Sequence, residues 1–101
     1  MTFAMAEPPQ LTQKQLSFLR SKAHPLEPRV GLGKQGATEG VRRELDQKLA
    51  THELVKVRLG RTIEVDLGAL ATELGAALVQ HVGRTATFYR PAAEPKLRLP
   101  Q

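Results

Sequence analysis

The sequence contains no cysteine and no tryptophan, and aromatic residues make up only 4% of it. Without cysteine the chain can form neither a disulfide nor a thiolate metal site, which is typical of proteins of a reducing cytosol. No apolar run approaches the length of a membrane span. The first ten residues have neither the basic nor the apolar segment of a signal peptide. We therefore expect a soluble, cytoplasmic protein with no membrane partner.

Acidic residues are also scarce. The chain has 15 Lys and Arg against 10 Asp and Glu, which gives a net charge of +5 and a pI near 10.1. Residues 28–63 carry eight basic and four acidic side chains, residues 64–83 carry three acidic ones and no Lys or Arg, and residues 84–101 have a net charge of +3. One face or end of the protein should therefore be basic, which favours an anionic partner.

A chain of 101 residues is long enough for one domain with a modest core. Residues 1–10, which include Pro8-Pro9, predict a disordered leader. Residues 11–91 hold the periodic apolar patterns of a folded domain. Residues 92–101 predict a basic tail that is free to move.

Helical spacing and capping residues predict three helices. Thr12 begins the first, which must end near His24 because a proline follows. Thr38 is a suitable N-cap for the second helix, and Asp66 for the third, which ends near Gly75.

Alternating apolar residues predict four strands, at 29–32, 54–59, 76–82 and 85–90. The last two strands are joined by Gly83-Arg84, a connection short enough for a hairpin. The order helix-strand-helix-strand-helix-strand-strand predicts an α+β fold, a four-stranded mixed sheet with helices packed mainly on one face. The other face would carry Lys56, Arg58, Tyr89 and Thr87.

The stretch from Val30 to Thr38 is the most informative, because three glycines surround one lysine between a strand and a helix. In the sequence Gly33-Lys34-Gln35-Gly36 no Cβ stands at either end of the turn, so the backbone can approach a ligand closely. The following helix directs its free N–H groups and the positive end of its dipole at this turn. Such an arrangement suits a phosphate group.

Residues around the loop decide which kind of phosphate site it can form. A dinucleotide site needs an acidic residue at the end of the next strand, whereas Glu53 stands before that strand. A P-loop needs a hydroxyl residue after the lysine, and Gln35 lacks one. Two interpretations of the loop remain. It is either a Gly-x-x-Gly clamp on a nucleic-acid backbone or a tight turn whose lysine is only solvated.

Catalytic patterns are absent. His24, His52 and His81 lie in separate predicted elements without the spacing of metal ligands, and Glu53 and Asp66 do not form a recognisable acid pair. We therefore expect no enzyme activity, no metal, no cofactor and no small-molecule substrate.

The few aromatic residues limit base stacking. Phe18 and Phe88 are expected in the core, while Tyr89 either stacks on a base from the open sheet face or lies in the core with its hydroxyl satisfied.

Taken together, a linked set of short motifs resembles the YhbY family, the stand-alone bacterial CRM domain. The resemblance runs from about Leu11 to Pro91. The motifs are Ala23-His24-Pro25-Leu26, Gly33-Lys34-Gln35-Gly36, Thr38-Glu39-Gly40-Val41, His52-Glu53-Leu54-Val55-Lys56-Val57, Gly83-Arg84 and Tyr89-Arg90-Pro91.

The resemblance implies a fold similar to the C-terminal domain of translation initiation factor three. It also implies an RNA-binding role in ribosome assembly, on precursors of the large subunit, with the loop at 33–36 as the principal contact. We expect Gly33, Lys34, Gln35, Gly36 and Thr38 to hold RNA phosphates. Basic side chains would widen the contact, namely Arg29, Arg42, Arg43, Lys56, Arg58 and Arg84.

An alternative function is a protein-interaction module. In that case the acidic third helix, with Glu64, Asp66 and Glu73, or the open sheet edge, would dock on a ribosomal protein, and the basic side would only steer association.

Overall fold

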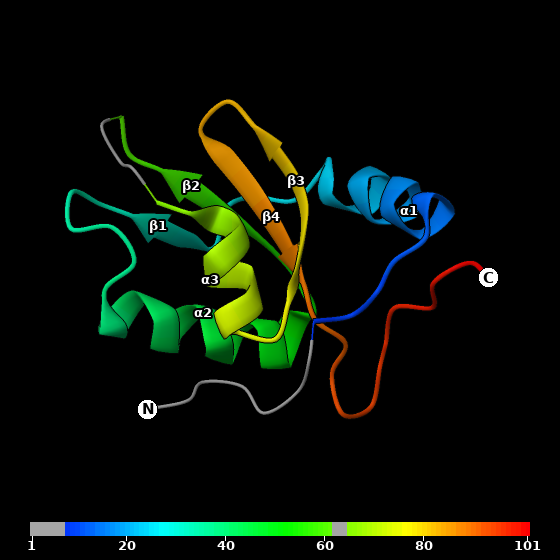
Figure 1. Ribbon diagram of the computed structural model, residues 1–101. Coiled ribbons are helices and arrows are strands. Elements are labelled where there is room, and N and C mark those ends of the chain that lie inside the picture. Colours follow the sequence, from blue (N-terminus) through cyan, green and yellow to red (C-terminus); the bar gives the residue numbers. More distant parts are fainter. Residues whose placement is uncertain (1–7, 62–64) are drawn as a thin grey trace.

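The fold is built on a four-stranded sheet, seen here in a computed structural model that describes residues 8–61 and 65–101. The elements follow the order predicted from the sequence (Figure 1): α1 (Gln13–Ala23), β1 (Val30–Leu32), α2 (Glu39–His52), β2 (Leu54–Leu59), α3 (Leu67–Glu73), β3 (Ala77–Val82) and β4 (Thr85–Tyr89).

The strands lie in the order β1-β2-β4-β3. β1 runs parallel to β2, with Val30 opposite Val57, and α2 forms the crossover between the two strands. β4 is antiparallel to both of its neighbours, and Val82 pairs with Thr85 across the predicted hairpin. The sheet is therefore mixed, which confirms the predicted fold class.

One face of the sheet packs on α2 and α3. Alternation along β2 places Val55 and Val57 on this face, where they are fully buried. They share a core with Leu45 of α2, Leu74 at the end of α3 and Phe88 of β4. This is the larger of the two apolar clusters and fixes the position of α2 beneath the sheet.

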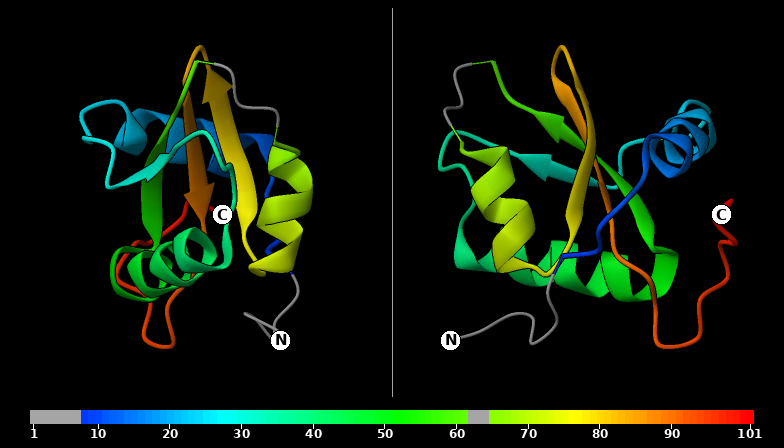
Figure 2. Two further views of the ribbon diagram at one scale, coloured as in Figure 1. Left: turned by 90° about the vertical axis from the view of Figure 1, so that its left-hand side faces the viewer. Right: turned by 45° about the vertical axis from the view of Figure 1, so that its right-hand side comes forward.

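The other face is partly covered, which corrects the expectation of an open sheet. Leu19 and Ala23 of α1 pack there against Leu54 and Tyr89, and Figure 2 shows α1 on the side of the strands away from α2 and α3. Tyr89 is consequently 3% exposed and Thr87 2%. The amphipathic pattern of the first helix predicted that it covers a surface, but not which face of the sheet. Of the two places considered for Tyr89, the structure shows the core.

The predicted helix caps are confirmed. Thr12 and Gln15 form a reciprocal capping box. The Thr38 hydroxyl accepts from the amide of Val41, and the Asp66 carboxylate accepts from the amide of Ala69. These bonds satisfy N–H groups that the helices cannot pair internally.

The C-terminal tail is held against the domain, contrary to the prediction that it moves freely. Its backbone amides at Ala92, Lys96 and Leu97 donate to the carboxylate of Glu53, and Leu97 and Leu99 pack on the α1 side of the sheet. The tail is held by contacts between distant segments. Glu53 is 1% exposed, and because a buried carboxylate needs hydrogen-bond donors, it accepts from the amides of the tail. Residues 1–7 of the predicted leader lie outside the described residues, as do Ile63 and Glu64.

Within residues 8–61 and 65–101, none of the helices combines the length and apolar character that crossing a membrane requires.

Candidate nucleic-acid interface

The loop after β1 is a tight turn closed by its own backbone. The amide of Gly36 donates to the carbonyl of Gly33 at 2.9 Å, and the amide of Thr38 donates to the carbonyl of Gly36 at 3.0 Å. Gly36 has φ +69°, and a Cβ there would lie 3.3 Å from Cγ2 of Val65. The backbone conformation therefore favours glycine at 36, and a side chain there would also require Val65 to move by a few tenths of an ångström.

Lys34 projects from this turn into solvent. It is exposed, as are Gly33 and Gln35, and it makes no ion pair within the described part of the chain. The loop borders a hollow of about 370 Å³ whose lining residues are Gly33, Lys34, Gln35, Gly36, Thr38 and Val41. The five residues predicted to hold phosphate thus surround one surface depression.

Thr38, the N-cap of α2, and Val41 of its first turn line the same depression. Thr38 satisfies the amide of Val41 with its side chain and the amide of Arg42 with its carbonyl. The amides of Glu39 and Gly40 have no acceptor among residues 8–61 and 65–101. Two N–H groups and the positive end of a 14-residue helix are therefore available to an anion here.

The two arginines predicted to extend this patch both lie beside acidic groups. Arg42 Nε is 3.2 Å from Glu73 Oε2, although its N–H is not directed at that oxygen. Arg43 Nη2 is 2.6 Å from Glu39 Oε1, one helical turn away. The positive charge that they add near the loop is thus partly neutralised, and Lys34 is the main cation of the depression.

A second group of predicted residues lies on the α1 side of the sheet. Lys56 and Arg58 project from β2 opposite to Val55 and Val57, and the amide of Arg29 donates to the carbonyl of Lys56. Arg29 and Arg58 line a hollow of about 340 Å³ together with Glu27, Pro28, Val30 and Gly31.

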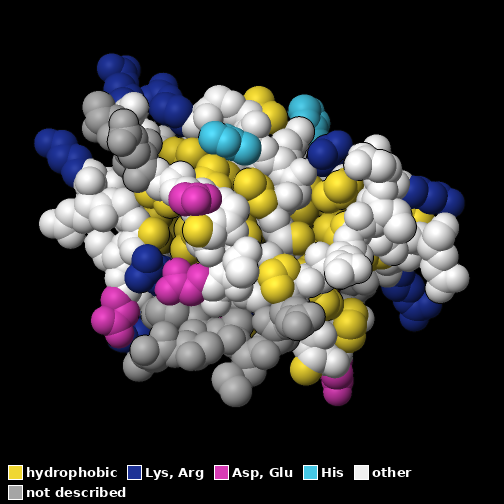
Figure 3. All heavy atoms as spheres, in the orientation of Figure 1, with side chains coloured by type: hydrophobic (Ala, Val, Ile, Leu, Met, Phe, Trp, Pro, Cys, Tyr) yellow, Lys and Arg dark blue, Asp and Glu magenta, His cyan; other side chains and the backbone are white. Residues whose placement is uncertain are grey.

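Arg84 lies in a third place, at the β3–β4 turn, where it lines a hollow with Arg61 and His81. Lys and Arg side chains stand at the end of the molecule that holds loop 33–38 and the end of β2, and others stand at the opposite end near α1, while acidic side chains lie over α3 and along the lower edge (Figures 1 and 3). The eleven predicted residues therefore form three neighbouring groups rather than one cluster.

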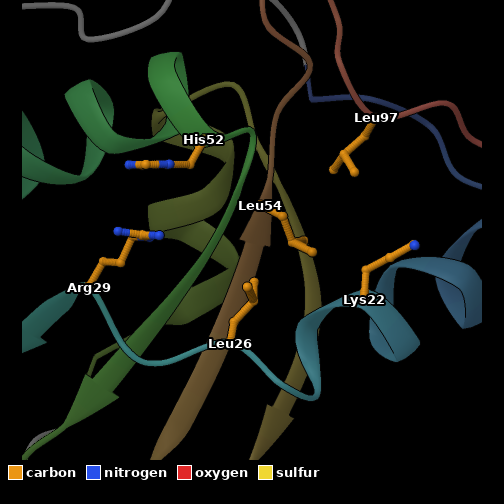
Figure 4. Close-up of a pocket in the computed structure, with 6 residues that line it drawn as sticks. All are labelled: Lys22, Leu26, Arg29, His52, Leu54 and Leu97. Carbon is orange, nitrogen blue, oxygen red and sulfur yellow. The ribbon is translucent and has the colours of Figure 1, made fainter.

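The sequence did not reveal a pocket formed by Lys22, Leu26, Arg29, His52, Leu54 and Leu97 (Figure 4). Its residues come from α1, the segment before β1, the end of α2, β2 and the tail, so no local pattern could have indicated it. His52 lies among positive charges here. Burial, followed by the charges of Arg29, Lys48 and Lys96, lowers its pKa below the usual 6.5.

No group of three or more His, Cys, Asp or Glu that could hold a metal ion occurs within residues 8–61 and 65–101.

Known proteins similar to this chain belong to one family and share a description. Residues 11–90 match the CRS1 / YhbY (CRM) domain. The chain is 41% identical over 95 residues to a Haemophilus influenzae protein named "RNA-binding protein", which covers 90% of this chain and 96% of that relative. It is 37% identical over 90 residues to "Probable RNA-binding protein YqeI" of Bacillus subtilis, covering 85% and 94% of the two chains.

A solved structure is also similar. The solution structure of a hypothetical protein from Staphylococcus aureus superimposes with a TM-score of 0.72 at 33% sequence identity, covering 90% of this chain and all of the other.

Proposed function

Because this chain belongs to the CRS1 / YhbY (CRM) domain family, we propose that it binds RNA through the loop at 33–36 and the adjoining end of α2. The observation that carries the proposal is the exposed Lys34, set between two glycines at the start of a helix and without an acidic partner in the described residues. Relatives named as RNA-binding proteins support the choice of ligand.

The loop would bind RNA through its phosphates. Lys34 neutralises one phosphate, and the amides of Glu39 and Gly40 donate to its oxygens. Arg29, Lys56 and Arg58 contact the strand farther along, on the α1 side of the sheet. Tyr89 is in the core and cannot stack on a base. Recognition therefore depends mainly on the shape and backbone of the RNA.

We further propose that the RNA is ribosomal, and that the protein acts in the cytoplasm as an assembly factor on precursors of the large subunit. The support for this finer statement is the family resemblance of the loop and strand motifs. Crosslinking the protein to RNA in cells and mapping the bound segments tests it directly. Crosslinks confined to transcripts other than ribosomal RNA would overturn it.

The site itself is tested with Lys34→Ala and a matched control, Lys14→Ala, which removes the same charge from the exposed surface of α1. If about four phosphates are neutralised, the logarithm of the binding constant should fall with the logarithm of salt concentration at a slope of about −3. Lys34→Ala should weaken binding and make the slope shallower by about one unit, whereas Lys14→Ala should do neither. Equal effects of both variants would remove the loop from the interface.

The alternative of a protein-interaction module has less support. Two of the acidic residues named for it have partners within the domain, because Asp66 caps α3 and Glu73 lies beside Arg42. If Asp66→Asn and Glu73→Gln abolished association with ribosomal particles but preserved binding of naked RNA, the alternative would replace the proposal. Lack of enzyme activity stays a prediction.

A further inference from the structure

A second pocket lies on the α1 side of the sheet, beside the residue that precedes β1. It encloses about 220 Å³ and is lined by Lys22, Leu26, Arg29, His52, Leu54 and Leu97. Figure 4 shows Leu54 and Leu26 in the middle, with His52 and Arg29 together on one side and Leu97 and Lys22 on the other. Its floor is therefore apolar, and basic groups stand at its margins.

These margins favour a ligand with negative charge. Arg29 and Lys22 are exposed cations, and the charges of Lys48 and Lys96 also act on His52. Glu53, the acidic residue next to His52, is buried and already accepts from three tail amides. The leucines in turn require an apolar surface, so the preferred ligand combines a flat apolar body with an anionic group.

The size of the pocket limits its ligand to a small group. Pockets for drug-sized ligands usually have volumes of about 300–1,000 Å³, so 220 Å³ suits a single base better than a peptide segment. Apart from the imidazole of His52, no aromatic side chain lines the pocket, and a base would be held mainly by apolar contact with leucine.

The pocket is also continuous with the proposed RNA contact. Arg29 lines both this pocket and the hollow that contains Gly31 and Arg58. Gly31 and Gly33 lie two residues apart on the same side of the chain, and the path from Arg29 to Gly33 spans roughly 13 Å of extended backbone. One strand of RNA can therefore contact both places. Glu27 is the one acidic residue among those that line this hollow.

We propose that this pocket receives one unpaired nucleotide of the bound RNA, with its base against Leu26, Leu54 and Leu97 and its phosphate at Arg29. The proposal rests on the proposed function, since it requires RNA to lie along β1. The wall at Leu97 lies beyond the segment that matches the family, residues 11–90. Its position depends on the hydrogen bond from its amide to Glu53, at 2.9 Å.

The first experiment uses small probes and the whole protein. AMP, adenosine and inorganic phosphate are titrated separately while the methyl resonances of the leucines are followed by NMR. We expect AMP to shift the methyl groups of Leu26, Leu54 and Leu97 in a saturable way, and phosphate alone to leave them unchanged. If AMP moved none of the three, or if phosphoserine moved them as strongly as AMP, a nucleotide pocket would be excluded.

The second experiment measures how much one unpaired nucleotide adds to the affinity for RNA. It uses two hairpins, one fully paired and one with a single bulged adenosine. Leu97→Glu places a carboxylate in the pocket, and Leu99→Glu is its matched control in the same tail, because Leu99 packs on the domain without lining the pocket. Leu97→Glu should weaken binding of the bulged hairpin about fivefold. This loss is at the lower end of what one base contact usually contributes to affinity. The affinity for the paired hairpin should not change. Leu99→Glu should weaken neither.

The two proposals fail in different ways. Lys34→Ala should weaken both hairpins to the same extent, and its failure to do so would refute the loop contact while leaving the AMP result intact. If Leu97→Glu weakened both hairpins equally, the pocket would contribute no nucleotide-specific binding, even with the loop contact confirmed.

Discussion

The carboxylate of Glu53 and the backbone amide of Leu97 lie 2.9 Å apart and join the end of α2 to the C-terminal tail. Every polar group of Glu53 is engaged. Its amide donates to Leu49, its carbonyl accepts from Arg90, and its carboxylate also accepts from the amides of Ala92 and Lys96. Glu53 has φ 65°, a conformation that costs free energy outside glycine. The contacts to the tail offset that cost.

Replacing Glu53 should release the tail. In Glu53→Gln one carboxylate oxygen becomes an NH₂ donor that faces other donors, so at least one of the three tail amides loses its acceptor and the charge that strengthens the remaining hydrogen bonds is gone. We expect a loss of about 2 kcal/mol of folding free energy and a melting temperature lower by roughly 10 °C. Trypsin should then cleave faster after Lys96 and Arg98. Glu94→Gln, an exposed acidic residue of the same tail, is the control. An unchanged cleavage rate in Glu53→Gln would mean that other contacts hold the tail.

Local features of the fold could be predicted from the sequence. The caps at Thr12, Thr38 and Asp66 act within a few residues, and the alternation in 54–59 follows from the geometry of a strand. The depression around Lys34 could be predicted for the same reason, because the loop and the helix that form it are consecutive.

Relationships between distant segments could not be predicted. An amphipathic helix must cover an apolar surface, but its pattern does not say which side of a sheet, so the sequence left Tyr89 either on an open sheet face or in the core, and only the packing of α1 decides between them. Nothing near Glu53 indicates that its donors lie in the tail. The pairing of Arg42 with Glu73 joins α2 to the end of α3 and likewise has no local signal.

The two glycines of the loop should respond differently to alanine. At Gly36 a side chain meets φ +69° and Val65, so Gly36→Ala should destabilise the protein by about 1–2 kcal/mol. At Gly33 nothing lies within 4 Å of a Cβ, and we expect Gly33→Ala to change stability by less than about 0.5 kcal/mol. Thermal or urea unfolding compares them. If RNA binds as proposed, Gly33→Ala should nevertheless weaken its binding, because the added methyl group enters the depression around Lys34. Equal destabilisation by both variants would contradict the described turn.

Glu73→Gln should strengthen RNA binding. Glu73 lies 3.2 Å from Arg42, so removing its charge leaves the arginine available to phosphate. The pair is about one-third exposed on both sides, and its loss should change stability by less than about 1 kcal/mol. We expect a gain of about two- to threefold in affinity at low salt and a slightly steeper salt slope. Glu44→Gln, which removes an exposed charge from α2, is the control for a general field effect. A gain of the same size in both variants would argue against a specific role of Arg42.

Tyr89 reports on the covering of the sheet by α1 and the tail, because it is the only tyrosine in the chain. Burial, and secondly the charge of Glu53, raises the pKa of its phenol above the usual 10.0. The unfolded chain therefore loses the proton at lower pH than the folded protein. The stability that this difference contributes is fully present below pH 10 and is lost as the pH rises through the pKa of the folded state.

Ultraviolet absorbance of the phenolate measures both titrations, with the urea-unfolded protein as the reference. In Glu53→Gln the phenol pKa should fall toward its usual value without reaching it, since burial is the larger cause. A folded protein whose phenol titrates like that of the unfolded chain would show that α1 does not cover this end of the sheet, and the pocket between them would lose its structural basis.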